Sequence, residues 1–384
     1  MPPKNQGNAV NERLAITHLV LSLDVGGLER MVIDLARQQR TAGHDARICC
    51  LWRKGTLAPQ AEEFGVPVYA FEKTPGFSPG VAWRIADQLR TSRVEVLHTH
   101  NAPVHHYGVA AAVLARVPVI VNTEHGQHGW DASKNDQRLN RLFRSSLRWT
   151  GAVAMVSDET RQYHLANGGF PGKKCRVILN GIPVDRFASR RATPGSRLPS
   201  LRFGTVARLA PVKDHITMVE AFARVAAQCP AAELHIAGDG EMRPRIVERI
   251  AALRLDPSVH LHGAVHDIPG FLSTLDVFVM SSLSEGLPVA LLEAMASGLP
   301  SVSTRVGGIP EVAPENEVAF YGPPHDSKAL AAQMLRMANA DLAAMGAAAN
   351  AIVRRRYGID RTADKYEQVY RELLGRGLAR RFVA

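Results

Sequence analysis

The segment SEGLPVALLEAMASGLP, residues 284–300, places Glu285 and Glu293 eight positions apart around a run of apolar residues. On a single helix, residues eight apart diverge by roughly 80°, so the two carboxylates do not share one helical face. Pro288 is typical of a first helical turn, and Gly298 is typical of a helix end. The sequence therefore predicts Glu285 in a loop and Glu293 inside the following helix. Between them lies a helix N-terminus that favours an anion.

Further groups suited to an anion follow other predicted strands. Arg208 and Lys213 come at the end of a strand, Gly238 opens a glycine turn before a helix, and His266 closes a short loop after another strand. Ligands of open α/β sheets bind at the carboxyl ends of the strands. Two cations and a helix N-terminus in one cleft would neutralise a diphosphate. Glu293 is then suited to the two hydroxyls of a ribose, and Glu285 to those of a sugar.

Short apolar strands alternate with amphipathic helices along the chain, which predicts an α/β fold with parallel sheets. The strands are predicted at 16–23, 46–52, 94–100, 118–124, 151–157, 201–209, 232–238, 258–263 and 277–282. Because the pattern restarts at Leu201, we expect two Rossmann-like lobes that face a central cleft. The expected divisions are an N-terminal lobe at 1–187, a linker at 188–200 rich in Arg, Ser, Pro and Gly, a C-terminal lobe at 201–358, and a C-terminal helix at 359–384 that packs back towards the N-terminal lobe.

The bulk properties restrict the class of protein. The 384 residues carry a formal net charge of +10, which favours an anionic partner. The sequence has no zinc-finger spacing, no aromatic RNA-binding motif and no long basic run, so nucleic acid is disfavoured. The longest apolar stretch, 107–121, is interrupted by Arg116, and no signal-peptide cleavage site follows the first apolar run. Four scattered cysteines fit a reducing compartment, and we expect a cytoplasmic protein.

Several motifs carry a resemblance to a known family. The segments VARLAPVKD, IAGDGEMR, SSLSEGLPVALLEAMASGLPSVST and VGGIPE resemble the C-terminal half of the retaining glycosyltransferases of family 4, which have the GT-B fold. This similarity spans roughly residues 201–320. The N-terminal half is similar more weakly, at 26–29, 98–100, 122–126, 156–157 and 178–183.

The resemblance implies that the N-terminal lobe is the acceptor side and that the C-terminal lobe binds the nucleotide sugar. It also implies roles for the residues that match its motifs. Arg208 and Lys213 would bind the donor diphosphate and act in catalysis, and Glu293 would bind the nucleotide ribose. Glu285, which is also implied as catalytic, would hold the transferred sugar. The remaining implied site residues are the donor-binding Gly26, Gly27, Gly286 and Leu287, and His125 at the reaction centre.

The implied reaction moves a hexosyl or N-acetylhexosaminyl group from a UDP- or GDP-sugar to a saccharide or lipid-linked acceptor in cell-surface or exopolysaccharide biosynthesis. The anomeric configuration of the sugar is retained, because the acceptor attacks the same face of the sugar from which the diphosphate departs. The chain lacks the Asp-x-Asp signature of metal-dependent sugar transferases, so neither a metal nor a cofactor is expected. Two alternatives share this fold: a nucleotide-sugar 2-epimerase, and a nucleotide-sugar-binding protein without catalysis.

Two features allow other interpretations. Six histidines crowd into 31 residues and suggest zinc, although no helical His-Glu-x-x-His spacing accompanies them: His98, His100, His105, His106, His125 and His128. The segment 137–149 predicts a basic amphipathic helix, with leucines, Phe143 and Trp149 on one side and four arginines on the other. Such a helix either lies on an anionic membrane or packs in the core with a solvated arginine face.

Overall fold

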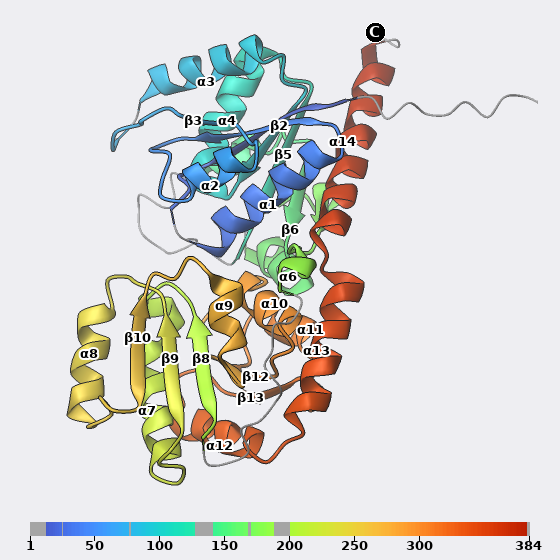
Figure 1. The fold of residues 1–384 in the computed structure, drawn as a ribbon. Helices are drawn as coiled ribbons and strands as arrows, with labels where there is room; N and C mark the ends of the chain where they lie inside the picture. Colours follow the sequence, from blue (N-terminus) through green and yellow to red (C-terminus); the bar gives the residue numbers. More distant parts are fainter. Residues whose placement is uncertain are drawn as a thin grey trace, which may run out of the picture.

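The computed structural model describes residues 13–24, 26–76, 78–126, 141–167, 170–187 and 200–381, with side chains as far as residue 376. The chain forms two lobes, each built on one parallel sheet, and α14 runs along one side of the molecule (Figure 1). The prediction of a two-lobed α/β fold is confirmed. The predicted linker lies almost entirely outside the described residues.

The N-terminal lobe contains a seven-stranded sheet with the order β3-β2-β1-β4-β5-β6-β7. Its central strands are buried along almost their whole length because helices cover both faces of a parallel sheet. The elements are β1 (Ala15–Val20), α1 (Gly27–Thr41), β2 (Asp45–Cys50), α2 (Ala58–Glu63), β3 (Val68–Ala70), α3 (Pro79–Thr91), β4 (Val96–His100), α4 (Ala102–Ala115), β5 (Val119–Glu124), β6 (Ala152–Met155), α6 (Asp158–Asn167), η1 (Gly172–Lys174), β7 (Cys175–Val177) and η2 (Val184–Phe187).

The C-terminal lobe contains a six-stranded sheet with the order β10-β9-β8-β11-β12-β13. The elements are β8 (Arg202–Val206), η3 (Pro211–Lys213), α7 (His215–Ala226), β9 (Glu233–Ala237), α8 (Arg243–Ala252), β10 (Val259–Gly263), α9 (Ile268–Ser273), β11 (Val277–Met280), α10 (Val289–Ala296), β12 (Ser301–Thr304), α11 (Ile309–Val312), β13 (Ala319–Gly322), α12 (Ser327–Met337), α13 (Leu342–Arg356) and α14 (Ile359–Arg381). All nine predicted strand segments form strands, each slightly shorter than its apolar run.

The strand orders determine where a ligand can bind. The direction of winding reverses between β1 and β4 in the first sheet and between β8 and β11 in the second. At such a switch point the loops at the carboxyl ends of the two strands diverge and leave a crevice. The loops after β1, β8 and β11 carry most of the site residues that the sequence predicts, so both lobes present predicted residues at a switch point, and His125 follows the neighbouring strand β5.

The C-terminal helix joins the lobes. After α13 the chain pairs with residue Ile182, whose amide donates to the carbonyl of Tyr357 at 2.9 Å. Helix α14 then packs along α1 and β5 of the N-terminal lobe, where Tyr366 and Tyr370 are fully buried. Within the described residues, no helix combines the length and the apolar composition needed to cross a membrane.

Candidate active site

The loop between β11 and α10 is held against the loop after β8. The amide of Leu283 donates to the carbonyl of Val212 at 2.8 Å, and the hydroxyl of Ser281 donates to the carbonyl of Lys213 at 2.8 Å. From the neighbouring strand β12, Thr304 donates its hydroxyl to the carbonyl of Ser282. These bonds fix the backbone on both sides of Glu285 before any ligand binds.

Lys213 and Glu285 meet in this loop, as the sequence predicts for one binding site. The ammonium nitrogen of Lys213 lies 2.5 Å from Oε1 of Glu285, and the hydroxyl of Ser282 donates to the same oxygen at 2.6 Å. The Glu285 side chain is only 8% exposed and that of Lys213 is 24% exposed. The pair is therefore preorganised, with a cation and a carboxylate that can each turn to a different part of a ligand.

Glycines allow the two lobes to touch beside this pair. A Cβ on Gly286 would lie 2.1 Å from the carbonyl oxygen of His125, which is closer than real Cβ contacts come. Gly307 has a φ of +57°, and a Cβ there would lie 1.9 Å from the carbonyl oxygen of Glu285. Any larger residue at either position would displace backbone. The structure thus brings His125, Glu285 and Gly286 together.

The loop after β1 faces Arg208 across the cleft. Gly26 and Gly27 begin α1, and the carboxylate of Glu29 folds back over Gly26 and accepts a hydrogen bond from its own amide. Burial raises the pKa of Glu29 to about 7, while that hydrogen bond and the positive charge of Arg208 act in the opposite direction. Arg208 itself is exposed. An anion at the start of α1 would meet the amides of the helix and this guanidinium.

Glu293 lies inside α10, as predicted, but its surroundings come from the other lobe. The helix begins after Pro288 and ends at Ala296, and Gly298 follows with a φ of +74°. Burial raises the pKa of Glu293 to about 7, and the charges of Arg30, Asp34 and Arg186 also act on this pKa. Its carboxylate accepts no hydrogen bond within the described part of the chain, so it retains the acceptor capacity that a ribose would need.

The remaining predicted donor-binding residues lie around these loops. A Cβ on Gly238 would lie 1.8 Å from the carbonyl oxygen of Ala207, and its φ is +147°, so glycine is required where the loops after β8 and β9 cross. Gly27 approaches Val289 at the start of α10. Leu287 is buried beside Gly286. His266 is exposed beyond the end of β10, and no contact joins it to the other predicted residues within the described chain.

Sequence reasoning missed several residues that shape the site. Asn180 donates its side-chain amide to the carbonyl of Leu287 at 3.1 Å, which joins the lobes at the start of α10. Glu311 of α11 accepts from the amides of Asp158 and Glu159 at 3.1 and 2.9 Å, at the N-terminus of α6. Both residues lie in segments that matched the family pattern, but their partners are more than 100 positions away.

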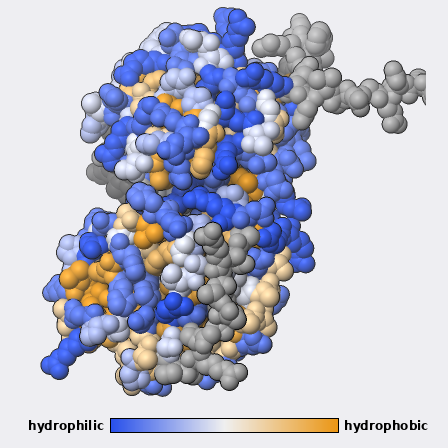
Figure 2. All heavy atoms as spheres, in the orientation of Figure 1, coloured by the Kyte–Doolittle hydropathy of each residue, from blue (hydrophilic) through white to orange (hydrophobic). Residues whose placement is uncertain are grey.

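A cleft of about 410 Å³ opens between the lobes beside the Glu285 loop. Glu159 of the N-terminal lobe lines it on one side, and Leu283, Ser284, Arg305, Val306, Gly307 and Pro310 of the C-terminal lobe line it on the other. On the face that Figure 2 shows, hydrophilic side chains predominate along the junction between the lobes. A polar ligand is therefore favoured there.

The crowded histidines form a buried hydrogen-bonded group. His98 and His100 of β4 lie beside His18 of β1, with possible ligand atoms within 4.8 Å of one another. However, the rings of His98 and His100 are stacked at 4.3 Å, so their lone pairs do not converge on one point. Tyr370 and Thr123 lie 2.7 Å from the two nitrogens of His98. This geometry favours a hydrogen-bonded network over the metal site that the sequence left open.

The other histidines of that run differ in their surroundings. His105 is fully buried between the hydroxyls of Thr99 and Thr150, at 2.6 and 2.9 Å. His106 is partly buried on the same helix. His128 lies outside the described residues.

The segment predicted as an amphipathic helix is described from residue 141 onward. Phe143 and Leu147 are buried, as the apolar side of the pattern predicts, whereas Leu142 and Trp149 are 52% and 47% exposed. Arg148 stacks over the ring of Trp149 at 3.9 Å. The exposed surface therefore combines arginines with two large apolar side chains. Only part of the apolar side of the predicted helix packs against the core, and the rest remains exposed.

Comparison with known families shows two matches that together span most of the chain. A family described as Glycosyltransferase Family 4 matches residues 25–186, and a family described as Glycosyl transferases group 1 matches residues 200–340. The first covers the loops after β1 and β4, and the second covers those after β8 and β11.

Individual relatives agree with this assignment. The chain is 24% identical to N-acetyl-alpha-D-glucosaminyl L-malate synthase of Bacillus anthracis, over 91% of this chain and 95% of the relative. It is 30% identical to the putative colanic acid biosynthesis glycosyltransferase WcaL of Escherichia coli, over 67% and 65%. The crystal structure of HepE from Anabaena in complex with UDP has the same fold, with a TM-score of 0.80 at 20% identity, over 94% of this chain and all of the HepE chain.

Proposed function

We propose, on the premise that this chain belongs to glycosyltransferase family 4, that it transfers a hexosyl or N-acetylhexosaminyl group from a nucleotide-diphosphate sugar with retention of configuration. The acceptor is a saccharide or a lipid-linked saccharide of a cell-surface or exported polysaccharide. The observation that carries the proposal is the preorganised pair of Lys213 and Glu285, which lies where the loop of Gly286 touches the backbone of His125.

Each part of this site suits one part of the reaction. Breaking the sugar–phosphate bond develops negative charge on the leaving diphosphate, which Lys213, Arg208 and the first amides of α1 would stabilise. When Lys213 turns to the phosphate, the oxygen of Glu285 that it holds becomes an acceptor for sugar hydroxyls. Glu293 would accept hydrogen bonds from the ribose. The acceptor attacks from the side of the leaving group, and the departing phosphate takes its proton.

We propose a UDP-sugar as the first donor to test. HepE, which shares the fold, has been crystallised with UDP and with UDP-glucose, and one relative is named as a UDP-galactose-dependent transferase. A thermal-shift screen of UDP, GDP, ADP and dTDP sugars tests this choice, because a ligand that binds only the native state raises its stability. A selective response to GDP-sugars would contradict it.

Product analysis tests the reaction itself. Release of nucleoside diphosphate only in the presence of an acceptor, with an anomeric configuration equal to that of the donor by NMR, is the expected result. An epimerised donor would identify an isomerase, and binding without turnover would identify a binding protein. Glu285→Ala should mainly lower kcat, whereas Glu293→Ala should mainly weaken nucleotide binding.

No metal is required in this proposal, because two side-chain cations and a helix N-terminus supply the positive charge. Activity is expected to persist after exhaustive chelation. Loss of activity that magnesium or zinc restores would contradict the proposal.

We also propose that the surface around residues 141–149 rests on an anionic membrane that carries the acceptor. Leu142 and Trp149 are exposed beside Arg141 and Arg148, and each arginine near such a surface contributes about 1 kcal/mol. Co-sedimentation with anionic but not zwitterionic liposomes, weakened by salt and by Trp149→Ala, is the expected result. Equal behaviour with both lipids would mean that this surface is only solvated.

A further inference from the structure

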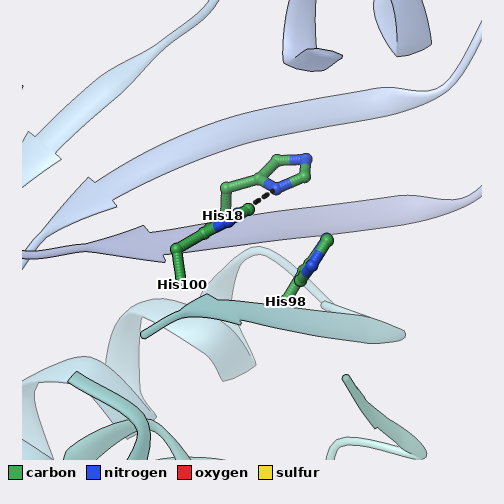
Figure 3. Close-up of side chains that lie close together, drawn as sticks. All are labelled: His18, His98 and His100. Atoms are coloured by element: carbon green, nitrogen blue, oxygen red, sulfur yellow. Dashed lines mark hydrogen bonds between the residues drawn. The ribbon is translucent and has the colours of Figure 1, made fainter. Parts of the chain in front are cut away.

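A chain of hydrogen bonds joins helix α1 to His125 through the core of the N-terminal lobe. Oε1 of Gln39 lies 2.7 Å from Nε2 of His18. Nδ1 of His18 lies 3.1 Å from Nε2 of His100, and Nδ1 of His100 lies 3.0 Å from Nε2 of His125. Figure 3 shows the second of these bonds, between a side chain of β1 and one of β4. Three imidazoles are thus connected in series.

Three members of this chain of hydrogen bonds are shielded from water in the core. Gln39, His18 and His100 are at most 2% exposed. Burial lowers the pKa of His18 to about 4, against the raising effect of its hydrogen bond to Gln39, and it lowers the pKa of His100 well below its ordinary value. Both rings are therefore neutral at pH 7, and each carries a single ring proton.

The number of protons matches the number of bonds. The three bonds of the chain need three donors. Neutral His18 and His100 each provide one N–H group, so the third must come from His125. Oε1 of Gln39 can only accept, so His18 must donate from Nε2 and accept at Nδ1. His100 then donates from Nε2 to His18 and accepts at Nδ1 from Nε2–H of His125. One amide oxygen at the end of the chain thereby decides the direction of every proton.

We propose that Gln39, His18 and His100 are positioning residues that hold His125 in the neutral tautomer with its proton on Nε2 and its lone pair on Nδ1. The inference rests on the function proposed above, because the resemblance alone makes His125 catalytic. In this tautomer, Nδ1 of His125 accepts a hydrogen bond and cannot donate one. His125 would therefore interact with a hydroxyl of the substrate and would not act as an acid towards the leaving group.

Residues of helix α14 contact this chain of hydrogen bonds through His98 and Thr123. The ring of His98 stacks on that of His100 at 4.3 Å, and the hydroxyl of Tyr370 lies 2.7 Å from Nδ1 of His98. Thr123, which lies 2.7 Å from the other nitrogen of His98, is also 2.9 Å from the hydroxyl of Tyr366. These contacts fix the orientation of the His100 ring, so that Nε2 reaches His18 and Nδ1 reaches His125.

The tautomer can be read directly in the full-length protein labelled with ¹⁵N-histidine. Long-range ¹H–¹⁵N spectra distinguish a ring protonated at Nε2 from one protonated at Nδ1, and the signals of His125 are assigned by their loss in His125→Gln. The proposal expects His125 protonated at Nε2 in the wild type at pH 7. A proton on Nδ1 would overturn it, whether or not the protein transfers sugar. Conversely, an Nε2 proton in a protein without transferase activity would support the proposed chain of hydrogen bonds and contradict the proposed function.

Two variants of Gln39 sharpen this test. Gln39→Leu removes the acceptor, so His125 should show mixed tautomers, and kcat should fall about tenfold or more because a correctly protonated group contributes about 10²–10⁴-fold. KM for the donor should stay within about twofold. Gln39→Glu keeps an acceptor and adds negative charge near His18, so the tautomer should persist while the acidic limb of the pH profile of kcat moves to higher pH.

The control is His105→Gln, which changes a fully buried histidine of the same lobe outside the chain. It should lower stability and leave the tautomer of His125 unchanged. An unchanged tautomer together with an unchanged kcat in folded Gln39→Leu would refute the proposal. If Gln39→Leu does not fold, the wild-type spectrum and the pH profile of Gln39→Glu still decide the question.

Discussion

The two lobes bring their side chains to the cleft in different ways. In the C-terminal lobe, Lys213, Ser282 and Glu285 meet through two loops whose backbones are bonded to each other. In the N-terminal lobe, His125 is held by a series of buried side chains from α1, β1 and β4. A site made of loops exchanges partners easily when a ligand arrives, whereas a buried series resists change. The first therefore suits binding of a charged donor, and the second suits orientation of one catalytic group.

Removal of a cation from the loop site should have the largest effect. Arg208 is exposed and its guanidinium makes no hydrogen bond within the described part of the chain, so Arg208→Ala should leave the fold intact. We expect kcat to fall about 10²–10³-fold, or roughly 3 kcal/mol, because a charge that stabilises the leaving group is lost. Steady-state kinetics measure this, with Arg249→Ala, which removes a surface pair with Glu220, as the matched control. Equal kinetics of the two variants would remove Arg208 from the site.

Two buried groups, Glu293 in the C-terminal lobe and His18 in the N-terminal lobe, should make stability respond to pH in opposite directions. The pKa of Glu293 is about 7 in the folded state against an ordinary value of 4.5, so the native state binds more protons than the unfolded state between these values. The contribution of Glu293 to stability is then full below pH 4.5 and is lost as the pH rises through 7, by up to roughly 3 kcal/mol. Urea unfolding of the wild type and of Glu293→Gln at pH 5 and pH 8 tests this. Between these two pH values, the free energy of unfolding of Glu293→Gln should fall less than that of the wild type.

The buried His18 should give stability the opposite dependence on pH. His18 has a folded pKa of about 4 against 6.5, so the unfolded state binds the proton first as the pH falls. The stability that His18 supplies is present above pH 6.5 and is lost on the way to pH 4. In the same unfolding series, His18→Gln should therefore be less acid-sensitive than the wild type. An identical slope for both proteins would show that His18 is not buried as a neutral ring.

A glycine contact should connect the two regions. The Cβ of Gly286→Ala would collide with the backbone of His125, so the lobes must separate or the loop must move. Overpacking of this kind costs about 1–3 kcal/mol, and we expect kcat to fall while nucleotide affinity, measured by calorimetry, falls less. Gly80→Ala, with no neighbour within 4 Å, is the control. Unchanged kcat would mean that this interlobe contact does not exist during turnover.

The difference between the lobes also explains what the sequence could predict. Lys213, Glu285 and Gly286 lie in short loops that follow strands, Glu293 lies in the helix after one of these loops, and local spacing predicts one site for all four. The surroundings of Glu293 were not predictable in this way, because Arg30 and Asp34 come from another lobe. The same holds for the histidine chain, since Gln39, His18 and His100 are far apart in the sequence. His18 and His100 meet because β1 pairs with β4, and Gln39 reaches His18 from α1. The division into domains at 1–187, 188–200, 201–358 and 359–384 stays a prediction.

The smallest expected effect concerns the contact between Glu311 and α6. The carboxylate of Glu311 lies across the lobe boundary and accepts from the amides of Asp158 and Glu159 at 3.1 and 2.9 Å. An anion at a helix N-terminus contributes about 0.3–1 kcal/mol, and Glu311→Gln would keep the size of the side chain but lose the charge. If the lobes must move apart to admit the donor, weakening this contact should raise the association rate and slightly lower the melting temperature. Stopped-flow binding of a fluorescent nucleotide measures the rate, and a slower association in Glu311→Gln would show that Glu311 holds the lobes in the form that binds the donor.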